Sequence, residues 1–266
     1  MKMSKTIIIT GTSSGVGLAL GNYLFKKGYN VYGLSRSVPK NAKFTTIPTD
    51  ITNEKEVDDA LDQILAKNST IDLLINNAGK GMVGPVENAK KNEIIDLFTL
   101  NIVAPSYLTS KVLPIMRKSN KGKIFNISSI GSEMGLPFRG FYSGSKSALD
   151  MITESLRYEL KNSGIEVCTV NLGDIRTDIA AHRIKSDISV DYAKVFDKVY
   201  DHMNADVSNG LDPETIAPFI EKLFTQKNKL KPHYYFGTAI QKLSIWVKTI
   251  IPQLWFEKII AKYSGL

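Results

Sequence analysis

Short hydrophobic runs alternate with amphipathic stretches along most of the chain. Apolar and β-branched runs predict buried strands at residues 6–10, 31–34, 71–75, 123–128 and 167–172, with a short final strand at 234–236. Apolar positions at helical spacing predict helices over residues 16–27, 92–117, 142–162 and 213–224, and a further helix that Asn53 and Glu56 begin as a capping box. The alternation is typical of βαβ units around a parallel sheet, and it disfavours an all-α bundle or a β-sandwich.

Glycines and prolines mark several of the predicted helix boundaries. Gly28 and Gly164 are expected to end the helices that precede them. Pro213 is expected in the first turn of the helix that it begins, where its missing N–H costs nothing. Pro105 falls inside the long helix over 92–117, so it should bend that helix or be absorbed locally.

Residues 239–266 form a C-terminal extension that predicts two amphipathic helices separated by Pro252. The apolar positions are Ile240, Leu243, Val247, Ile250 and Ile251 on the first helix and Trp255, Phe256, Ile259 and Ile260 on the second. Lys248 and Pro252 interrupt runs that are already far too short to span a bilayer. Because amphipathic stripes most often mark a core face, we expect the extension to pack over a pocket or against another subunit, with membrane contact at most peripheral.

Composition favours one globular domain. The chain has 266 residues, of which 43% are hydrophobic and 23% charged, so it can bury a full core and is neither disordered nor a disulfide scaffold. No repeat or interdomain linker is visible, so we expect one catalytic domain over residues 1–238 with the extension attached to it. The net charge is +8, and seven lysines against one glutamate place +6 of it after residue 226.

The cysteine and histidine residues point to no metal or disulfide. Cys168 is the only cysteine and lies inside an apolar run, which predicts a small buried hydrophobe. His182, His202 and His233 lack metal-ligand spacing, so no metal site is expected. No secretory leader precedes the first strand, and we expect the protein to reside in the reducing cytoplasm.

The first predicted strand runs into a glycine-rich turn over residues 10–17 and then into a helix. Gly11, Gly15 and Gly17 let the backbone pass close to a pyrophosphate, and the helix N-terminus offers unpaired N–H groups with a partial positive charge. A P-loop would need a lysine after Gly15, where Val16 stands, and the spacing also differs from the G-x-G-x-x-G fingerprint. The turn alone therefore predicts a phosphate site but leaves a purely structural role open.

Three further motifs follow this turn. Asn-Asn-Ala-Gly occupies residues 76–79 after a predicted strand, Ser128 and Ser129 follow another, and Tyr142-Ser-Gly-Ser-Lys146 begins a helix. With these motifs in this order from about residue 6 to residue 177, the chain resembles the short-chain dehydrogenase/reductase family. The resemblance implies an α/β fold: a doubly wound, Rossmann-like parallel sheet of about seven strands with flanking helices, carrying a nicotinamide dinucleotide at the C-terminal edge of the strands.

The residues at the end of the second predicted strand indicate whether NAD(H) or NADP(H) binds. An acidic side chain there would accept hydrogen bonds from the ribose 2′-hydroxyl and repel a 2′-phosphate. This chain has Ser35 and Arg36 instead, and an arginine can clamp a phosphate, so we expect NADP(H) to be preferred with NAD(H) possible. A solvated loop arginine is the alternative reading of Arg36. By resemblance Asp50 contacts the adenine, while Ser14 stands where many family members carry a second basic residue.

The resemblance also assigns cofactor contacts to the loops along that edge of the sheet. These residues are Gly11, Ser13, Ser14, Gly15, Val16, Gly17, Ile51, Asn77, Ala78, Gly79, Asn101, Tyr142, Lys146, Gly173, Ile175 and Thr177. Leu172 departs from the Pro-Gly pair that the family usually carries at this place. Leucine does not fix φ as proline does, so the cavity wall beside the nicotinamide is expected to differ from that of the family.

Tyr142 and Lys146 lie four residues apart on a predicted helix, so their side chains share one face. A free tyrosine has a pKa of about 10, and an adjacent ammonium favours its phenolate. We therefore expect Tyr142 to be the general acid and base, with Ser129 hydrogen-bonded to the same substrate oxygen. By resemblance Lys146 also holds the nicotinamide ribose, and Asn101 supports a proton relay to that lysine. Taken alone, such a pair would be read as helix packing with a solvated lysine.

Three other function classes are weighed against this one. Residues 143–146 spell the acyl-transfer signature S-x-x-K, but its partner motifs S-D-N and K-T-G are missing. The positive net charge would suit a nucleic-acid binder, but the aromatic residues of the extension share helix faces with Ile and Leu, so no nucleic acid is expected. A non-catalytic NADP(H)-sensing interaction protein stays open as the alternative to an enzyme, although it would have less need of Ser129, Tyr142 and Lys146 together.

Residues 173–211 are polar, irregular and weakly periodic, and by resemblance the part over 178–211 covers the substrate. Its apolar residues suit a partly apolar lid, with a helical surface excursion as the alternative: Ile179, Ile184, Ile188, Val190, Tyr192, Val195 and Phe196. The extension is similar to tails of family members that act on lipophilic alcohols or carbonyls. The sequence thus predicts an NADP(H)-dependent oxidoreductase that interconverts a lipophilic carbonyl and an alcohol by hydride transfer. The family resemblance implies a homodimer or homotetramer.

Overall fold

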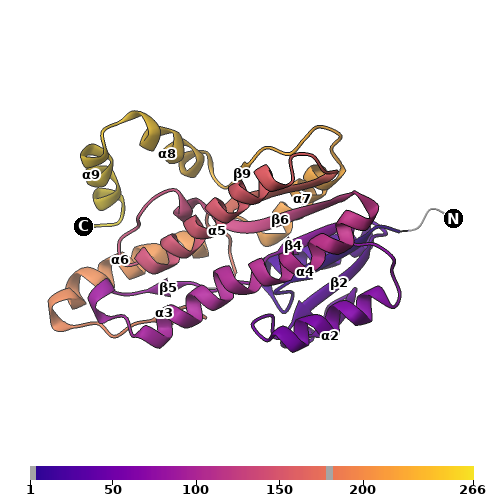
Figure 1. The fold of residues 1–266 in the computed structure, drawn as a ribbon. Coiled ribbons are helices and arrows are strands. Elements are labelled where there is room, and N and C mark those ends of the chain that lie inside the picture. Colours follow the sequence, from indigo (N-terminus) through magenta and orange to yellow (C-terminus); the bar gives the residue numbers. More distant parts are fainter. Residues whose placement is uncertain (1–3, 178–181) are drawn as a thin grey trace.

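Seven parallel strands form the central sheet (Figure 1). The computed structural model describes residues 4–177 and 182–266. The strands of this sheet are β1 (Thr6–Thr10), β2 (Asn30–Ser35), β3 (Thr45–Pro48), β4 (Leu73–Asn76), β6 (Gly122–Ser129), β7 (Ile165–Leu172) and β9 (His233–Phe236). Their spatial order is β3-β2-β1-β4-β6-β7-β9, and each neighbouring pair is parallel. The doubly wound Rossmann-like sheet expected from the sequence is confirmed.

Helices cover both faces of the sheet, because successive residues of a buried strand point to opposite sides. Ile7 and Ile9 of β1 belong to a core with α1 (Gly15–Lys26) and α7 (Ile216–Thr225). Ile8, between them, belongs to the opposite core. That core also contains residues of α2 (Glu54–Leu65), α4 (Ala104–Ser119) and α5 (Gly140–Glu159). Every residue of β1 is therefore buried, which explains its unbroken apolar run.

The strand order reverses between β1 and β4. From β1 the chain builds outward through β2 and β3, and it then returns to place β4 on the other side of β1. The loops that leave the C-terminal ends of β1 and β4 diverge at this point, which opens a crevice there. Both the glycine-rich turn and the Asn-Asn-Ala-Gly motif follow these two strands, so the topology brings them together.

Several boundaries match the sequence. Gly28 follows α1 with a φ of +86°, and its N–H donates to the carbonyl of Phe25, so it ends the helix as expected. Pro213 begins a 3₁₀ turn, Pro213–Thr215, that leads into α7. The side chain of Asn53 caps α2 by accepting hydrogen bonds from the N–H groups of Lys55 and Glu56. The capping box is incomplete, because the Glu56 carboxylate accepts instead from the N–H of Asp50 at 2.7 Å.

The helix predicted over 92–117 is confirmed as three consecutive helical segments, namely α3 (Lys91–Phe98), a π-helical turn (Thr99–Val103) and α4. The widened turn absorbs Pro105 locally at the start of α4, which is one of the two outcomes expected. The boundary predicted at Gly164 was wrong. Gly164 does not end α5, which already stops at Glu159. A side chain at Gly164 would meet the carbonyl oxygen of Asn120, so close packing explains this glycine.

The segment over 173–211 is more regular than predicted. It contains α6 (Val190–Ser208) and β8 (Ile184–Lys185), and β8 pairs with β5 (Met82–Val83). The buried stripe of α6 is Phe196, Val199, Met203 and Val207. Val190 and Val195, which were expected in an apolar lid, are exposed on this helix. Residues 178–181, with the predicted lid residue Ile179 among them, lie outside the described residues.

The C-terminal extension forms the two helices that the sequence predicts, α8 (Ala239–Ile250) and α9 (Gln253–Tyr263). They stand beside the sheet above α5 and α6 (Figure 1). Phe256 is buried in a small core with Ile130 and Met134, and the Tyr263 hydroxyl donates to Asp206 on α6 at 2.8 Å. Among residues 4–177 and 182–266, no helix is long and apolar enough to cross a membrane.

Candidate active site

The glycine-rich turn connects β1 to α1 at the crevice. Gly11 and Gly15 have φ values of +70° and +53°, which favour glycine. A Cβ at Gly17 would lie 2.2 Å from the carbonyl oxygen of Gly11, so only hydrogen fits there. No side chain caps the N-terminus of α1 at Ser14. The N–H groups of the first turn of α1 therefore have no capping side chain, and backbone atoms surround them. Such uncapped N–H groups at a helix N-terminus can bind a pyrophosphate.

Asn77 and Thr10 hold this cradle in place. The Asn77 side-chain amide donates to the carbonyls of Thr10 and Gly11 at 2.9 and 3.2 Å. The Thr10 hydroxyl accepts hydrogen bonds from the N–H groups of Asn77 and Ala78, each at 3.0 Å. These bonds join the ends of β1 and β4. Sequence reasoning missed Thr10, because nothing distinguishes it from any other β-branched strand residue.

The end of β2 carries no carboxylate. Ser35 is buried, its hydroxyl donates to the carbonyl of Ser37 at 2.8 Å, and Arg36 is exposed at the cavity wall. Asp50 faces the same part of the cavity and accepts hydrogen bonds from the N–H and hydroxyl of Thr52 at 2.9 and 2.7 Å. Burial alone would raise the pKa of Asp50, but these hydrogen bonds and the charge of Arg36 together lower it. Asp50 is therefore ionised, and Arg36 is the group near it able to attract a phosphate.

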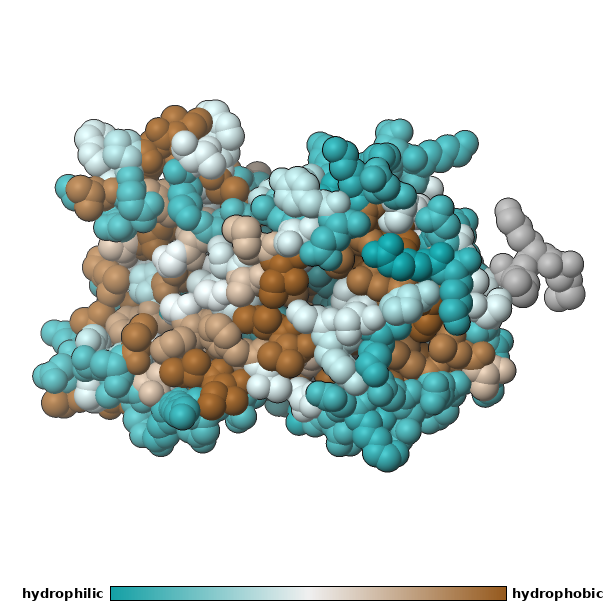
Figure 2. Space-filling model, viewed as in Figure 1, coloured by the Kyte–Doolittle hydropathy of each residue, from teal (hydrophilic) through white to brown (hydrophobic). Residues whose placement is uncertain are grey.

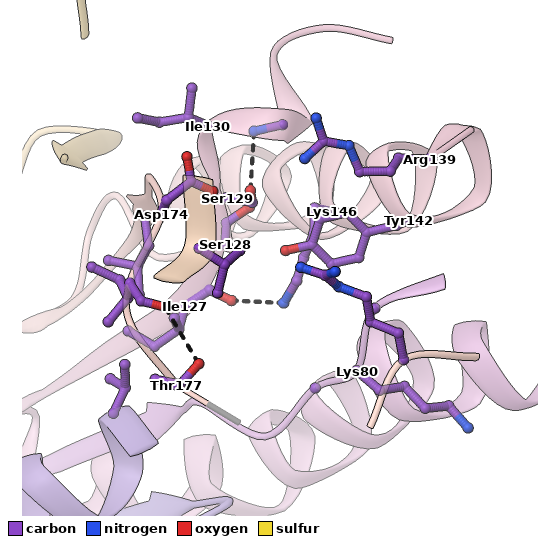
Figure 3. A pocket seen from close by; sticks show the side chains of 18 of the residues that line it. Lys80, Ile127, Ser128, Ser129, Ile130, Arg139, Tyr142, Lys146, Asp174 and Thr177 are labelled. Atoms are coloured by element: carbon purple, nitrogen blue, oxygen red, sulfur yellow. Dashed lines mark hydrogen bonds between the residues drawn. The ribbon is translucent and has the colours of Figure 1, made fainter. Parts of the chain in front are cut away.

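Ser129, Tyr142 and Lys146 meet where β6 ends and α5 begins (Figure 3). The Ser129 oxygen accepts a hydrogen bond from the N–H of Gly131 at 3.0 Å, which leaves its hydroxyl hydrogen free to donate. The Lys146 ammonium donates to the main-chain carbonyl of Ile127 at 2.9 Å. Tyr142 lies between them, with its hydroxyl directed toward the end of β6 in Figure 3. The three side chains that the sequence singled out are thus brought together.

Burial dominates the titration of this group. It raises the pKa of Tyr142, and hydrogen bonding with Ser129 and the charges of Arg139 and Arg183 act in the opposite direction. Burial also lowers the pKa of Lys146 to about 8, although the charge of Asp150 raises it. Burial thus favours the neutral phenol of Tyr142 and weakens the hold of Lys146 on its proton.

Asn101 lies behind this group, in the π-helical turn. Its side-chain oxygen accepts from the N–H of Lys80, and its amide nitrogen donates to the carbonyl of Lys80 and the hydroxyl of Ser145, each at 3.0 Å. A Cβ at Gly79 would lie 3.1 Å from the Asn101 oxygen and 3.3 Å from the Lys146 nitrogen. Asn101 therefore fixes the loop that passes beside Lys146, and π-helical turns are frequent at functional sites.

Asp150 is a neighbour of this site that sequence reasoning missed. It lies one turn beyond Lys146 on α5, and its carboxylate accepts hydrogen bonds from the Ser132 hydroxyl and the Asn171 amide at 2.6 and 2.7 Å. Burial raises its pKa. The spacing of four residues from Tyr142 to Lys146 to Asp150 was visible in the sequence and could have found it.

The loop after β7 closes the opposite wall. Leu172 is buried, and the N–H of Gly173 donates to the carbonyl of Phe236 at 2.8 Å. A Cβ at Gly173 would lie 2.1 Å from the side chain of Gln241 on α8. The methyl group of Thr177 lies 3.0 Å from the position of a Cβ at Gly15. This loop therefore packs against both the glycine-rich turn and the C-terminal extension.

One cavity of about 1180 Å³ joins these parts. All predicted site residues line it except Gly17 and Asn101, which lie behind its wall. It continues past Tyr142 to apolar side chains of the extension, namely Val247, Phe256, Ile259 and Ile260. The lid contributes His182, Arg183, Asp206 and Val207 to its lining. Within the described ranges, no group of three or more His, Cys, Asp or Glu side chains is placed to hold a metal ion.

The comparisons with known proteins agree with this arrangement. The family profile described as short chain dehydrogenase matches residues 5–187. The 3-ketodihydrosphingosine reductase of Bacteroides thetaiotaomicron is 38% identical over 226 residues, which cover 84% of each chain. The NADPH-dependent 3-dehydrocapnine reductase of Ornithobacterium rhinotracheale is 31% identical, with 96% of this chain and 95% of that protein covered.

A solved structure extends the similarity to the C-terminal extension. The crystal structure of a short-chain dehydrogenase from Streptomyces avermitilis superposes with a TM-score of 0.83 at 26% identity, covering 98% of each chain. The chain belongs to the short-chain dehydrogenase/reductase family, whose members are oxidoreductases that use NAD(P)(H).

Proposed function

We propose that the protein is an NADP(H)-dependent oxidoreductase that interconverts a carbonyl and an alcohol on a lipophilic substrate. The observation that carries this proposal is the continuity of the cavity. Ser129, Tyr142 and Lys146 lie between the glycine-rich turn at one end and the apolar side chains of α8 and α9 at the other. A dinucleotide fits the first end and an extended apolar chain fits the second.

The proposed cofactor contacts follow from the cradle geometry. The pyrophosphate would lie at the N-terminus of α1, on the loop from Gly11 to Val16, because no side chain caps the N–H groups of the first turn there. Ser35 and Arg36 would hold the 2′-phosphate. Asp50 and Ile51 would contact the adenine. The remaining contacts would come from Asn77, Ala78 and Gly79 on one wall and from Gly173, Ile175 and Thr177 on the other. The bound nicotinamide supplies or accepts a hydride.

In the proposed chemistry the proton is moved by residues of this chain. In the reductive direction the Tyr142 hydroxyl donates its proton to the substrate carbonyl oxygen, and Ser129 donates a hydrogen bond to the same oxygen. The ammonium of Lys146 stabilises the phenolate that forms on Tyr142. Asn101 positions the loop at Lys80 beside Lys146. The proton that Tyr142 donates would be replaced through Lys146.

The names of relatives support this direction and cofactor. Both proteins are named as reductases, and one name states NADPH. The ketone in the name of the Bacteroides protein's substrate agrees with the carbonyl chemistry proposed for Tyr142. The apolar end of the cavity, walled by the extension, supports a lipophilic substrate.

We further propose a cytoplasmic homodimer or homotetramer whose extension touches a membrane at most peripherally. Figure 2 shows hydrophobic residues over the face where α4 and α5 lie. Met151, Ile152 and Tyr158 are exposed on α5, and Val103 is exposed in the π-helical turn that precedes α4. Exposed apolar side chains on these helices would suit a subunit contact.

The test is NADPH oxidation with methyl ketones of increasing chain length. We expect turnover to rise from the shortest to the longest ketone, because each added methylene buries apolar surface in the cavity. The same series with NADH tests the cofactor preference. If calorimetry shows NADPH binding but neither these ketones nor long-chain ketones with a charged terminal group are reduced, the protein is a non-catalytic NADP(H)-sensing protein and the proposal is wrong.

A further inference from the structure

Two arginines from different elements enter the cavity beside Tyr142. Arg139 directly precedes α5, three residues before Tyr142, and Figure 3 shows its side chain extending into the same cavity as the tyrosine. Arg183 comes from the lid, just before β8, where it packs against Gly81. Both line the cavity, and the charges of both lower the pKa of Tyr142. The mechanism proposed above uses neither guanidinium group.

Among residues 4–177 and 182–266, neither guanidinium group forms an ion pair with a carboxylate. The Nε atom of Arg139 is buried and has no hydrogen-bond partner within this part of the chain. Arg183 donates one hydrogen bond at 2.8 Å, to the neutral side-chain oxygen of Asn204. Burial lowers the pKa of both groups, and the charge of Arg139 lowers that of Arg183 further. Two neighbouring, partly buried cations repel each other, and an anion bound between them would offset that repulsion.

Two of the carboxylates that line the cavity, Asp174 and Asp206, are hydrogen-bonded to the extension. Asp174 accepts a hydrogen bond from the Gln241 amide at 2.5 Å, and Asp206 accepts from the Tyr263 hydroxyl at 2.8 Å. Burial and the charge of Asp206 raise the pKa of Asp174, whereas the charges of Arg139 and Arg183 and the hydrogen bond from Gln241 act in the opposite direction. The carboxylates thus interact with the arginines through their charge but form no ion pair with them.

The backbone that presents Arg139 is strained. Phe138 has a φ of +57°, in a region that a bulky residue rarely adopts. The strain is held by a hydrogen bond of 2.9 Å from the N–H of Gly84 to the Phe138 carbonyl and by edge contacts of the Phe138 ring with Tyr192 and Phe196. The fold thus stabilises an unfavourable conformation next to Arg139, as functional sites often do.

We propose that Arg139 and Arg183 bind an anionic head group of the substrate, a sulfonate, phosphate or carboxylate, close to the carbonyl that Tyr142 protonates. This inference rests on the proposed function and names its substrate class: an amphiphilic ketone whose apolar chain lies along α8 and α9. Guanidinium groups suit such anions because they donate paired hydrogen bonds in one plane.

The binding test uses decane-1-sulfonate, decyl phosphate and decanol, with the NADP-loaded full-length protein and calorimetry. The wild type should bind both anions about tenfold or more tightly than the alcohol, and Arg183→Gln should remove most of that difference. Arg176→Gln is the matched control, because Arg176 pairs with Asp212 and does not line the cavity. Equal binding of the anions and the alcohol by the wild type would overturn the proposal whether or not the protein reduces any ketone.

The kinetic test separates head-group binding from an effect on Tyr142. Long-chain ketones with a terminal sulfonate or hydroxyl are compared as substrates of the wild type, Arg139→Gln and Arg183→Gln, after thermal melts confirm folding. Both variants should raise KM for the sulfonate about 10- to 100-fold and change it little for the alcohol. If either variant slows both substrates equally, its arginine acts through Tyr142 or the fold, and the head-group role is wrong. Failure of the wild type to reduce either ketone would count against the proposed oxidoreductase activity alone.

Discussion

Lys146 and Asp150 lie one turn apart on α5 with their charged groups buried, and each finds its hydrogen bonds elsewhere. The Lys146 ammonium donates to the carbonyl of Ile127 at 2.9 Å, whereas the Asp150 carboxylate accepts from Ser132 and Asn171. Burial shifts both pKa values toward the neutral form, and it lowers that of Lys146 to about 8. The site thus keeps charges in a place where they cost stability.

We therefore expect Lys146→Met to stabilise the protein while it abolishes turnover. Below about pH 8 the native state holds a buried ammonium that the unfolded chain holds in water, so removing it should raise the free energy of unfolding by about 2 kcal/mol. Between pH 8 and the ordinary lysine value of 10.5, the native amine is neutral while the unfolded chain still binds a proton. The stability of the wild type rises through this window, and the advantage of the variant shrinks.

Urea unfolding at several pH values measures this difference. Lys118→Met is the control, because Lys118 is exposed on α4 and its replacement should leave stability unchanged at every pH. A loss of stability in Lys146→Met near pH 7 would show that the bond to Ile127 outweighs the cost of burying the charge.

Tyr142→Phe should lower turnover by about 10²–10⁴-fold and leave the dissociation constant of NADPH nearly unchanged. The ring keeps its place, but the proton donor is lost. Ser129→Ala should cost about 10²–10³ in turnover, as expected for one donor to the reacting oxygen. Single-turnover reduction of a long methyl ketone measures both effects, with the exposed Tyr158→Phe as control. Retained activity in Tyr142→Phe would reject Tyr142 as the acid.

The parts predicted correctly from sequence are those that depend on local pattern. The unbroken run Ile7-Ile8-Ile9 identifies a strand buried on both faces, and Gly28 identifies the end of a helix. The spacing of Tyr142 and Lys146 places them on one face of α5. Such features need no knowledge of how distant segments meet.

The parts that were missed depend on tertiary context. β3 has only four residues and one buried side chain, so it owes its existence to pairing with β2. The apolar stripe of α6 is diluted by charges, and its partners, Val83 and Phe138, come from elsewhere in the chain. Arg139 lies only three positions before Tyr142, but Arg183 lies 44 positions beyond Arg139 and no motif contains both. The sequence therefore could not show that the two arginines line one cavity.

Arg36→Ala should weaken NADPH binding by about 10- to 100-fold and leave NADH binding nearly unchanged. A charge-assisted hydrogen bond to a phosphate contributes about 1.5–3 kcal/mol, and only NADPH carries the 2′-phosphate. Fluorescence titration of both cofactors measures the effect, with the exposed Arg117→Ala as control. Equal dissociation constants for NADPH and NADH in the unmodified protein would contradict the proposed preference.

Ile260→Ala should raise KM for long methyl ketones more than for short ones. Ile260 lines the cavity and packs against the small core around Phe256, so its truncation removes apolar contact from the far end of a long chain. We expect a change of about tenfold for the longest ketone. Leu254→Ala is the control, because Leu254 lies on the same helix, is 70% exposed and does not line the cavity. Equal effects of the two variants would place the substrate away from the extension.

The outer surface of the extension gives the last prediction. Trp246 and Trp255 are 63% and 67% exposed, and Lys242, Lys258 and Lys262 are exposed around them. An anionic bilayer attracts each nearby basic residue by about 1 kcal/mol, and the tryptophans suit its interface. We expect the protein to sediment with phosphatidylglycerol vesicles at low salt, to be released at high salt, and not to bind phosphatidylcholine vesicles.

The double variant Trp246→Ala with Trp255→Ala should bind phosphatidylglycerol vesicles more weakly. The control variant Tyr158→Ala, which removes an exposed aromatic ring on α5, should bind them as the wild type does. Binding that resists high salt would mean that the extension inserts into the bilayer, and no binding at low salt would confine its role to the cavity.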